Sequence, residues 1–154
     1  MKKTIVIIDG MGGGIGAALA AKIRPLDGLE GPEGKTELEI IALGTNGVAA
    51  ERMVKAGAHR GASGENAVKV SAGLGDFILG PIGIVIMNSL MGELSPVMAE
   101  AILKAPGERI LLPLENDHFY LAGLEPLSLA KMIDRAVDYL RVRLTGAPPP
   151  IAKR

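Results

Sequence analysis

The segment from Thr4 to Ala21, TIVIIDGMGGGIGAALAA, constrains the fold of this chain more than any other part of it. Thr4 to Ile8 is a short, β-branched, apolar run, which is typical of a strand buried on both faces. From Ile15 the apolar spacing becomes that of a helix, which we expect to end before Pro25. Five glycines within seven residues lie between them, so the sequence predicts a strand, a glycine-rich turn and a helix.

The glycine-rich turn is suited to binding a phosphate. Unpaired N–H groups and the positive end of a helix attract an anion, and glycines let the backbone approach a ligand closely. The spacing Gly10-x-x-x-Gly14-x-Gly16 resembles the dinucleotide site of short-chain dehydrogenases/reductases, although the usual G-x-G-x-x-G is absent. We predict a site for NAD(P) or another nucleotide at Asp9, Gly10, Gly12, Gly13, Gly14, Ile15 and Gly16. The alternative is a tight turn that binds nothing.

Two further turns are predicted to line the same crevice. The strand Glu39–Leu43 ends at Gly44, Thr45 and Asn46, and the strand Phe77–Leu79 ends at Gly80, Pro81, Ile82 and Gly83. The carboxyl ends of parallel strands share one sheet edge, where ligands bind in such folds. The carboxylate that usually accepts from the ribose 2′-OH of NAD is missing after the second strand. That turn holds no arginine either, so a 2′-phosphate has no evident partner beyond Thr45, Asn46 or a reaching Arg52.

The remaining pattern alternates helices with strands. We predict four further helices, from Thr45 or Asn46 to Ala56, from Ser63 to Ala72, from Ser95 to the residue before Pro106, and from Ser128 to Leu144. Strands are predicted within Gly57–Ala62, at Arg109–Leu114 and at His118–Ala122. The last strand follows a turn at Glu115–Asp117, which suggests an antiparallel hairpin. Val68 and Val70 also fit a strand, and Ile84–Met87 fits either a strand or a buried helix.

These elements predict an α/β fold with a three-layer, doubly wound, mostly parallel sheet, Rossmann-like, in a single domain. The expected strand order is 3-2-1-4-5, with the last strand at an edge. The domain should span residues 1–144, and the proline-rich tail 145–154 should be disordered.

Composition narrows the partners and the chemistry. Seventeen basic residues balance 17 acidic ones and aromatic residues make up only 3%, so we expect no nucleic-acid partner. No cysteine is present, and no stretch approaches the roughly 20 apolar residues of a membrane helix. We expect a cytoplasmic protein with no membrane partner and no metal site. The apolar segment Ile82–Leu90 predicts a homo-oligomer, a dimer being the commonest case.

Taken together, IIDGMGGGIG, IIALGTN, GENA, FILGPIGIVIMNS, MGELSPVMAEAI and ILLPL resemble the bacterial family catalogued as domain of unknown function 3842. The resemblance runs to about Leu144 and leaves out the proline tail. It implies a small, cytoplasmic, Rossmann-like protein, and it implies no catalytic residue, because none is established for the family. The loop Pro25–Thr36 looks like an expansion of a shorter connection.

The sequence leaves the chemistry open. The Tyr-x-x-x-Lys pair of a short-chain reductase is absent, because Leu124 follows Tyr120 and Arg143 follows Tyr139 at that spacing. His59 and His118 are isolated and are expected on the surface or in loops. The polar residues of undetermined role are Glu65, Asn66, Asn88, Ser89 and Glu93.

Two functions fit these observations. One is a nucleotide-cofactor binder, either enzyme or sensor, and the other is a non-catalytic oligomeric regulatory or assembly protein that keeps the scaffold without a ligand. A side chain added at Gly14 or Gly16 should block a ligand and leave the fold intact in the first case.

Overall fold

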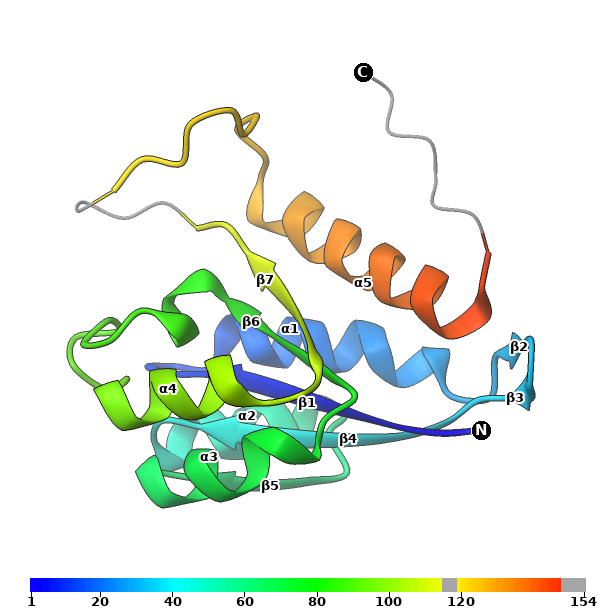
Figure 1. Ribbon diagram of the computed structural model, residues 1–154, viewed down its shortest axis with the longest axis horizontal. Helices are drawn as coiled ribbons and strands as arrows, with labels where there is room; N and C mark the ends of the chain where they lie inside the picture. Colours follow the sequence, from blue (N-terminus) through cyan, green and yellow to red (C-terminus); the bar gives the residue numbers. More distant parts are fainter. Residues whose placement is uncertain (115–118, 148–154) are drawn as a thin grey trace.

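The computed structural model describes residues 1–114 and 119–147. Its centre is a parallel sheet formed by β1 (Lys2–Asp9), β4 (Glu37–Gly44), β5 (Arg60–Ser63), β6 (Phe77–Pro81) and β7 (Glu108–Leu112). The strands lie in the order β5-β4-β1-β6-β7, which places β1 in the middle (Figure 1). This is the predicted order 3-2-1-4-5 of a doubly wound, Rossmann-like α/β domain.

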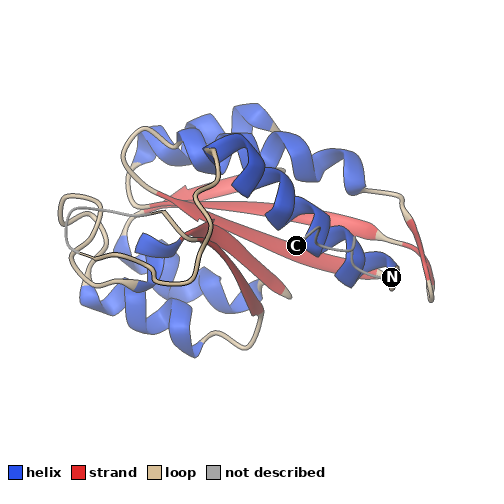
Figure 2. Cartoon of the chain, turned by 90° about the horizontal axis from the view of Figure 1, so that it is seen from above, coloured by secondary structure: helices blue, strands red, loops and turns tan. Residues whose placement is uncertain are grey.

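Helices cover both faces of the sheet (Figure 2). One face packs against α1 (Gly14–Ile23), α2 (Gly47–Ala56) and α5 (Leu129–Thr145), and the other against α3 (Glu65–Ser71) and α4 (Pro96–Lys104). Successive side chains of a strand point to opposite faces. Ile5 and Ile7 of β1 therefore belong to the first core, and Val6 and Ile8 belong to the second. The central strand is apolar without interruption because both of its faces are buried.

The parallel direction of the strands brings their following turns together. The turns after β1, β4 and β6 open at the end of the sheet opposite the N-terminus, and the segment 82–95 lies at that end as well (Figure 1). None of the helices in the described ranges is long and apolar enough to cross a membrane.

In three segments the structure either decides between the predicted alternatives or differs from the prediction. The loop Pro25–Thr36 contains a small hairpin of β2 (Glu30–Gly31) and β3 (Gly34–Lys35). The segment with Val68 and Val70 is helical, since Val68 is buried whereas Val70 is 67% exposed. The apolar run Ile84–Met87 is neither a strand nor a buried helix, because a 3-10 turn (Ile82–Val85) buries Ile84 and the chain then leaves the core.

The prediction of a last, antiparallel strand is wrong for the part of it that the structure describes. Phe119 is an isolated bridge residue, and the residues up to Ala122 are irregular. Strand β7 ends at Leu112 because the following Pro113 has no N–H group to donate to a ladder. The turn Glu115–Asp117 and His118 lie outside the described residues, as does the tail from Pro148 onward.

Candidate functional site

The glycine-rich turn is held by the carboxylate of Asp9, which is 4% exposed at the end of β1. Asp9 Oδ1 accepts from the amide of Gly10 at 2.8 Å, and Oδ2 accepts from the amide of Gly16 in the first turn of α1 at 2.7 Å. Burial raises the pKa of Asp9, while bonds from the amides of Gly16, Gly10 and Ile15 and the charge of Arg52 oppose that increase. Asp9 therefore serves to hold its own turn.

Three of the five glycines are required by the packing of the turn itself. A Cβ at Gly10 would lie 2.5 Å from Thr45 Oγ1, and one at Gly13 would lie 2.7 Å from the Cα atom of Ala49. Gly13 also has a φ of 71°, which disfavours side chains. A Cβ at Gly16 would lie 2.3 Å from Met53 Sδ. A substitution at Gly16 should therefore disturb the packing of α1 against Met53, so we expect it to lower stability as well as any ligand binding.

Gly12 and Gly14 have no such packing reason. Both are exposed, and the nearest atom to an added Cβ is Nη1 of Arg52, at 3.8 Å and 3.4 Å respectively. No partner for either amide is found among the residues that the structure describes. Arg52 Nη1 donates to the Gly12 carbonyl at 3.1 Å, so a guanidinium lies beside these two glycines at the start of α1.

A carboxylate that the sequence did not place forms the next part of this site. Oε1 of Glu93 accepts from Thr45 Oγ1 at 2.6 Å, from Asn46 Nδ2 at 2.7 Å and from the amide of Met11 at 2.8 Å. The bond from Thr45 is the main reason that the pKa of Glu93 is lowered, with the bonds from Met11 and Asn46 adding to it. Glu93 therefore links the glycine-rich turn to the end of β4.

The segment 82–95 carries Glu93 to this position through an unusual backbone. Asn88, Leu90 and Met91 have positive φ angles of 63°, 55° and 57°, which are uncommon for residues other than glycine. Asn88 is exposed, so it is not a buried polar group that would need a partner. Ser89 Oγ donates to the Gly83 carbonyl, and this bond closes the segment on itself.

The turn after β6 stands beside the glycine-rich turn. A Cβ at Gly80 would lie 2.3 Å from the Ile8 carbonyl oxygen, so Gly80 permits the close approach of β6 to β1. Pro81 is buried, and Ile82 and Gly83 are half-buried. The side chain of Leu90 lies between the two turns, because a Cβ atom at Gly10 or at Gly83 would be within 4 Å of it.

Four polar residues lie at or next to the start of a helix or strand, namely Asn46, His59, Glu65 and Asn66. Asn46 is the N-cap of α2, where its Oδ1 accepts from the amide of Ala49. Glu65 and Asn66 are exposed at the start of α3. His59 is exposed as predicted, and its Nδ1 accepts from the amide of Ile40 at 2.9 Å.

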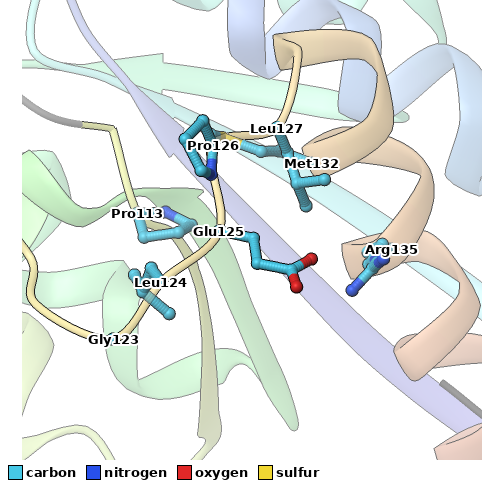
Figure 3. Close-up of a pocket in the computed structure, with 8 residues that line it drawn as sticks. All are labelled: Pro113, Gly123, Leu124, Glu125, Pro126, Leu127, Met132 and Arg135. Carbon is cyan, nitrogen blue, oxygen red and sulfur yellow. The ribbon is translucent and has the colours of Figure 1, made fainter. Parts of the chain in front are cut away.

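A separate cavity of about 530 Å³ lies between α5 and the segment before it. It is lined by Pro113, Gly123, Leu124, Glu125, Pro126, Leu127, Met132 and Arg135. Figure 3 shows the side chains of Glu125 and Arg135 turned toward each other across it. Pro113 directly follows β7, so the cavity is at the same end of the sheet as the glycine-rich turn. No residue of that turn lines it.

The chain belongs to the family described as domain of unknown function (DUF3842), whose model matches residues 4–145. No curated protein and no solved structure matches it.

Proposed function

We propose that this member of the DUF3842 family binds a nucleotide or dinucleotide cofactor at the Gly10–Gly16 turn. The observation that carries the proposal is the open surface at Gly12 and Gly14, next to the guanidinium of Arg52. Packing explains Gly10, Gly13 and Gly16, but it does not explain why Gly12 and Gly14 lack side chains. Gly12 and Gly14 lack Cβ atoms, and their amides have no partner among the described residues. At the carboxyl edge of a parallel sheet this favours the approach of a phosphate.

The charges favour a whole nucleotide over free phosphate. Asp9 and Glu93 are both within the site, and Arg52 supplies the nearby positive charge. A phosphate alone would meet net negative charge. A nucleotide adds ribose hydroxyls, which can donate to carboxylates, and a base that removes apolar surface from water. We expect this function in the cytoplasm and assign no catalytic residue.

A non-catalytic regulatory or assembly role is the second candidate, and one observation favours it. Asp9 and Glu93 already satisfy the amides of Gly10, Met11 and Gly16. These three amides of the turn therefore need no ligand to satisfy them.

Thermal unfolding with a panel of nucleotides separates the two functions. We expect NAD(P), ADP or a related nucleotide to stabilise the protein, by about 2.7 kcal/mol at 100 times its Kd. Gly14→Ala should remove that stabilisation and leave the melting temperature of the free protein unchanged, because its Cβ would have only Arg52 as a neighbour. If no nucleotide stabilises the protein, the second candidate is favoured.

We also propose that the protein is a homo-oligomer, most simply a dimer. Ile84 is buried in the core, and Val85 and Leu90 pack against it. Met87 and Met91, in contrast, are 62% and 90% exposed. Light scattering at tens of micromolar should give at least twice the mass of the monomer. The double variant Met87→Asp and Met91→Asp should have the mass of a monomer. A monomeric parent protein would contradict this proposal.

A further inference from the structure

We propose that Glu93 recognises the ribose of the bound nucleotide, so that the site accepts free ribose hydroxyls and rejects a 2′-phosphate. This inference rests on the nucleotide-binding function proposed above and specifies the class of nucleotide. It concerns a residue that enters the site from the segment 82–95 and not from the end of β4, where such an acid usually stands.

The position of Glu93 fits this role. In dinucleotide-binding folds the adenosine ribose lies beside the glycine-rich turn at the end of the second strand of the sheet. Glu93 contacts both places, through the amide of Met11 and through the side chains of Thr45 and Asn46. It thus supplies the carboxylate that Gly44–Asn46 lacks.

The two oxygens of Glu93 are used differently. Oε1 receives all three bonds, which fix the orientation of the carboxylate. Oε2 receives no bond from any residue that the structure describes, so it has its acceptor capacity free. A ribose hydroxyl can donate to that oxygen, whereas a phosphate oxygen cannot and carries a like charge.

Calorimetric titrations with NAD and NADP test the inference, because the two ligands differ only in the 2′-phosphate. We expect the parent protein to bind NAD about 10- to 100-fold more tightly, the range expected for a hydrogen bond to a charged acceptor. Glu93→Gln should weaken NAD binding and bring the two affinities close together. The variant keeps an Oε1 acceptor for the three donors, so the segment should stay in place.

Glu100→Gln is the matched control, since it removes the same charge from an exposed residue of α4 that pairs with Lys104. It should leave both affinities unchanged. Tighter NAD binding by Glu93→Gln would overturn the inference, because Glu93 would then obstruct the site. The inference would also be overturned if the parent protein bound NAD and NADP equally. If Gly14→Ala then weakened the binding of both, the proposal of nucleotide binding would still hold. If no nucleotide of the panel, NAD and NADP included, binds the parent protein, both proposals fail.

Discussion

Asp9→Ala should lower the free energy of unfolding by about 2–4 kcal/mol, because it leaves two buried amides without an acceptor. Those amides belong to Gly10 and Gly16, and the carboxylate between them is 4% exposed. Water has little access to replace it. Denaturant unfolding followed by circular dichroism measures the effect.

Asp76→Ala is the matched control for this substitution. Asp76 also accepts a backbone amide, that of Thr4 at 2.8 Å, but its side chain is 44% exposed and water can take its place. We expect a loss of about 0.5–1.5 kcal/mol or less there. Equal losses of stability for the two variants would contradict the argument that burial makes the hydrogen bonds of Asp9 more costly to lose.

The pH dependence of stability provides a second readout for Asp9. A raised pKa means that the folded state binds the Asp9 proton more tightly than the unfolded state. Asp9 therefore contributes a loss of stability as the pH rises from the ordinary aspartate pKa through the raised one. This contribution should be missing from Asp9→Ala, so the difference in stability between parent and variant should shrink with rising pH over that window.

Gly13→Ala should destabilise the protein by about 2–4 kcal/mol, as the sum of two costs. A left-handed backbone costs an alanine about 1–2 kcal/mol, and overpacking costs about 1–3 kcal/mol more. The added Cβ would stand 2.7 Å from Cα and 3.0 Å from the carbonyl oxygen of Ala49, which are backbone atoms and cannot swing aside.

Gly14→Ala, one residue further, is the control for this glycine. Its Cβ would have a single neighbour, the end of Arg52 at 3.4 Å, and alanine suits a helix better than glycine by up to about 1 kcal/mol. We expect no loss of stability in the free protein. The same denaturant series measures both variants, and a Gly13→Ala variant as stable as Gly14→Ala would contradict the packing argument.

Local patterns explain what could be predicted from the sequence. The apolar run Thr4–Ile8 identified the central strand. Ser128 could be predicted as a helix start, and Thr45 or Asn46 as another, because an N-cap acts over three residues; the structure gives Asn46. Over its described part, Phe119–Ala122, the expected last strand is not formed, because a short strand-like run does not show whether a sheet edge is available for pairing.

Long-range contacts explain what could not be predicted. Glu93 lies 48 residues from Thr45 and 82 from Met11 along the chain, and no local spacing connects them. Leu90 and Met91 have positive φ angles although neither is a glycine, so their residue types did not indicate the bend. Gly16 looked like a ligand glycine, yet its partner Met53 comes from another helix.

Binding of a nucleotide at the glycine-rich turn is tested most directly by titrating ¹⁵N-labelled protein with NAD and recording amide spectra. The resonances of Gly12 and Gly14 should shift along a saturable curve, while those of Gly123 and Leu124 beside the α5 cavity stay in place. Unmoved Gly12 and Gly14 resonances at millimolar NAD, or shifts confined to the α5 cavity, would contradict it.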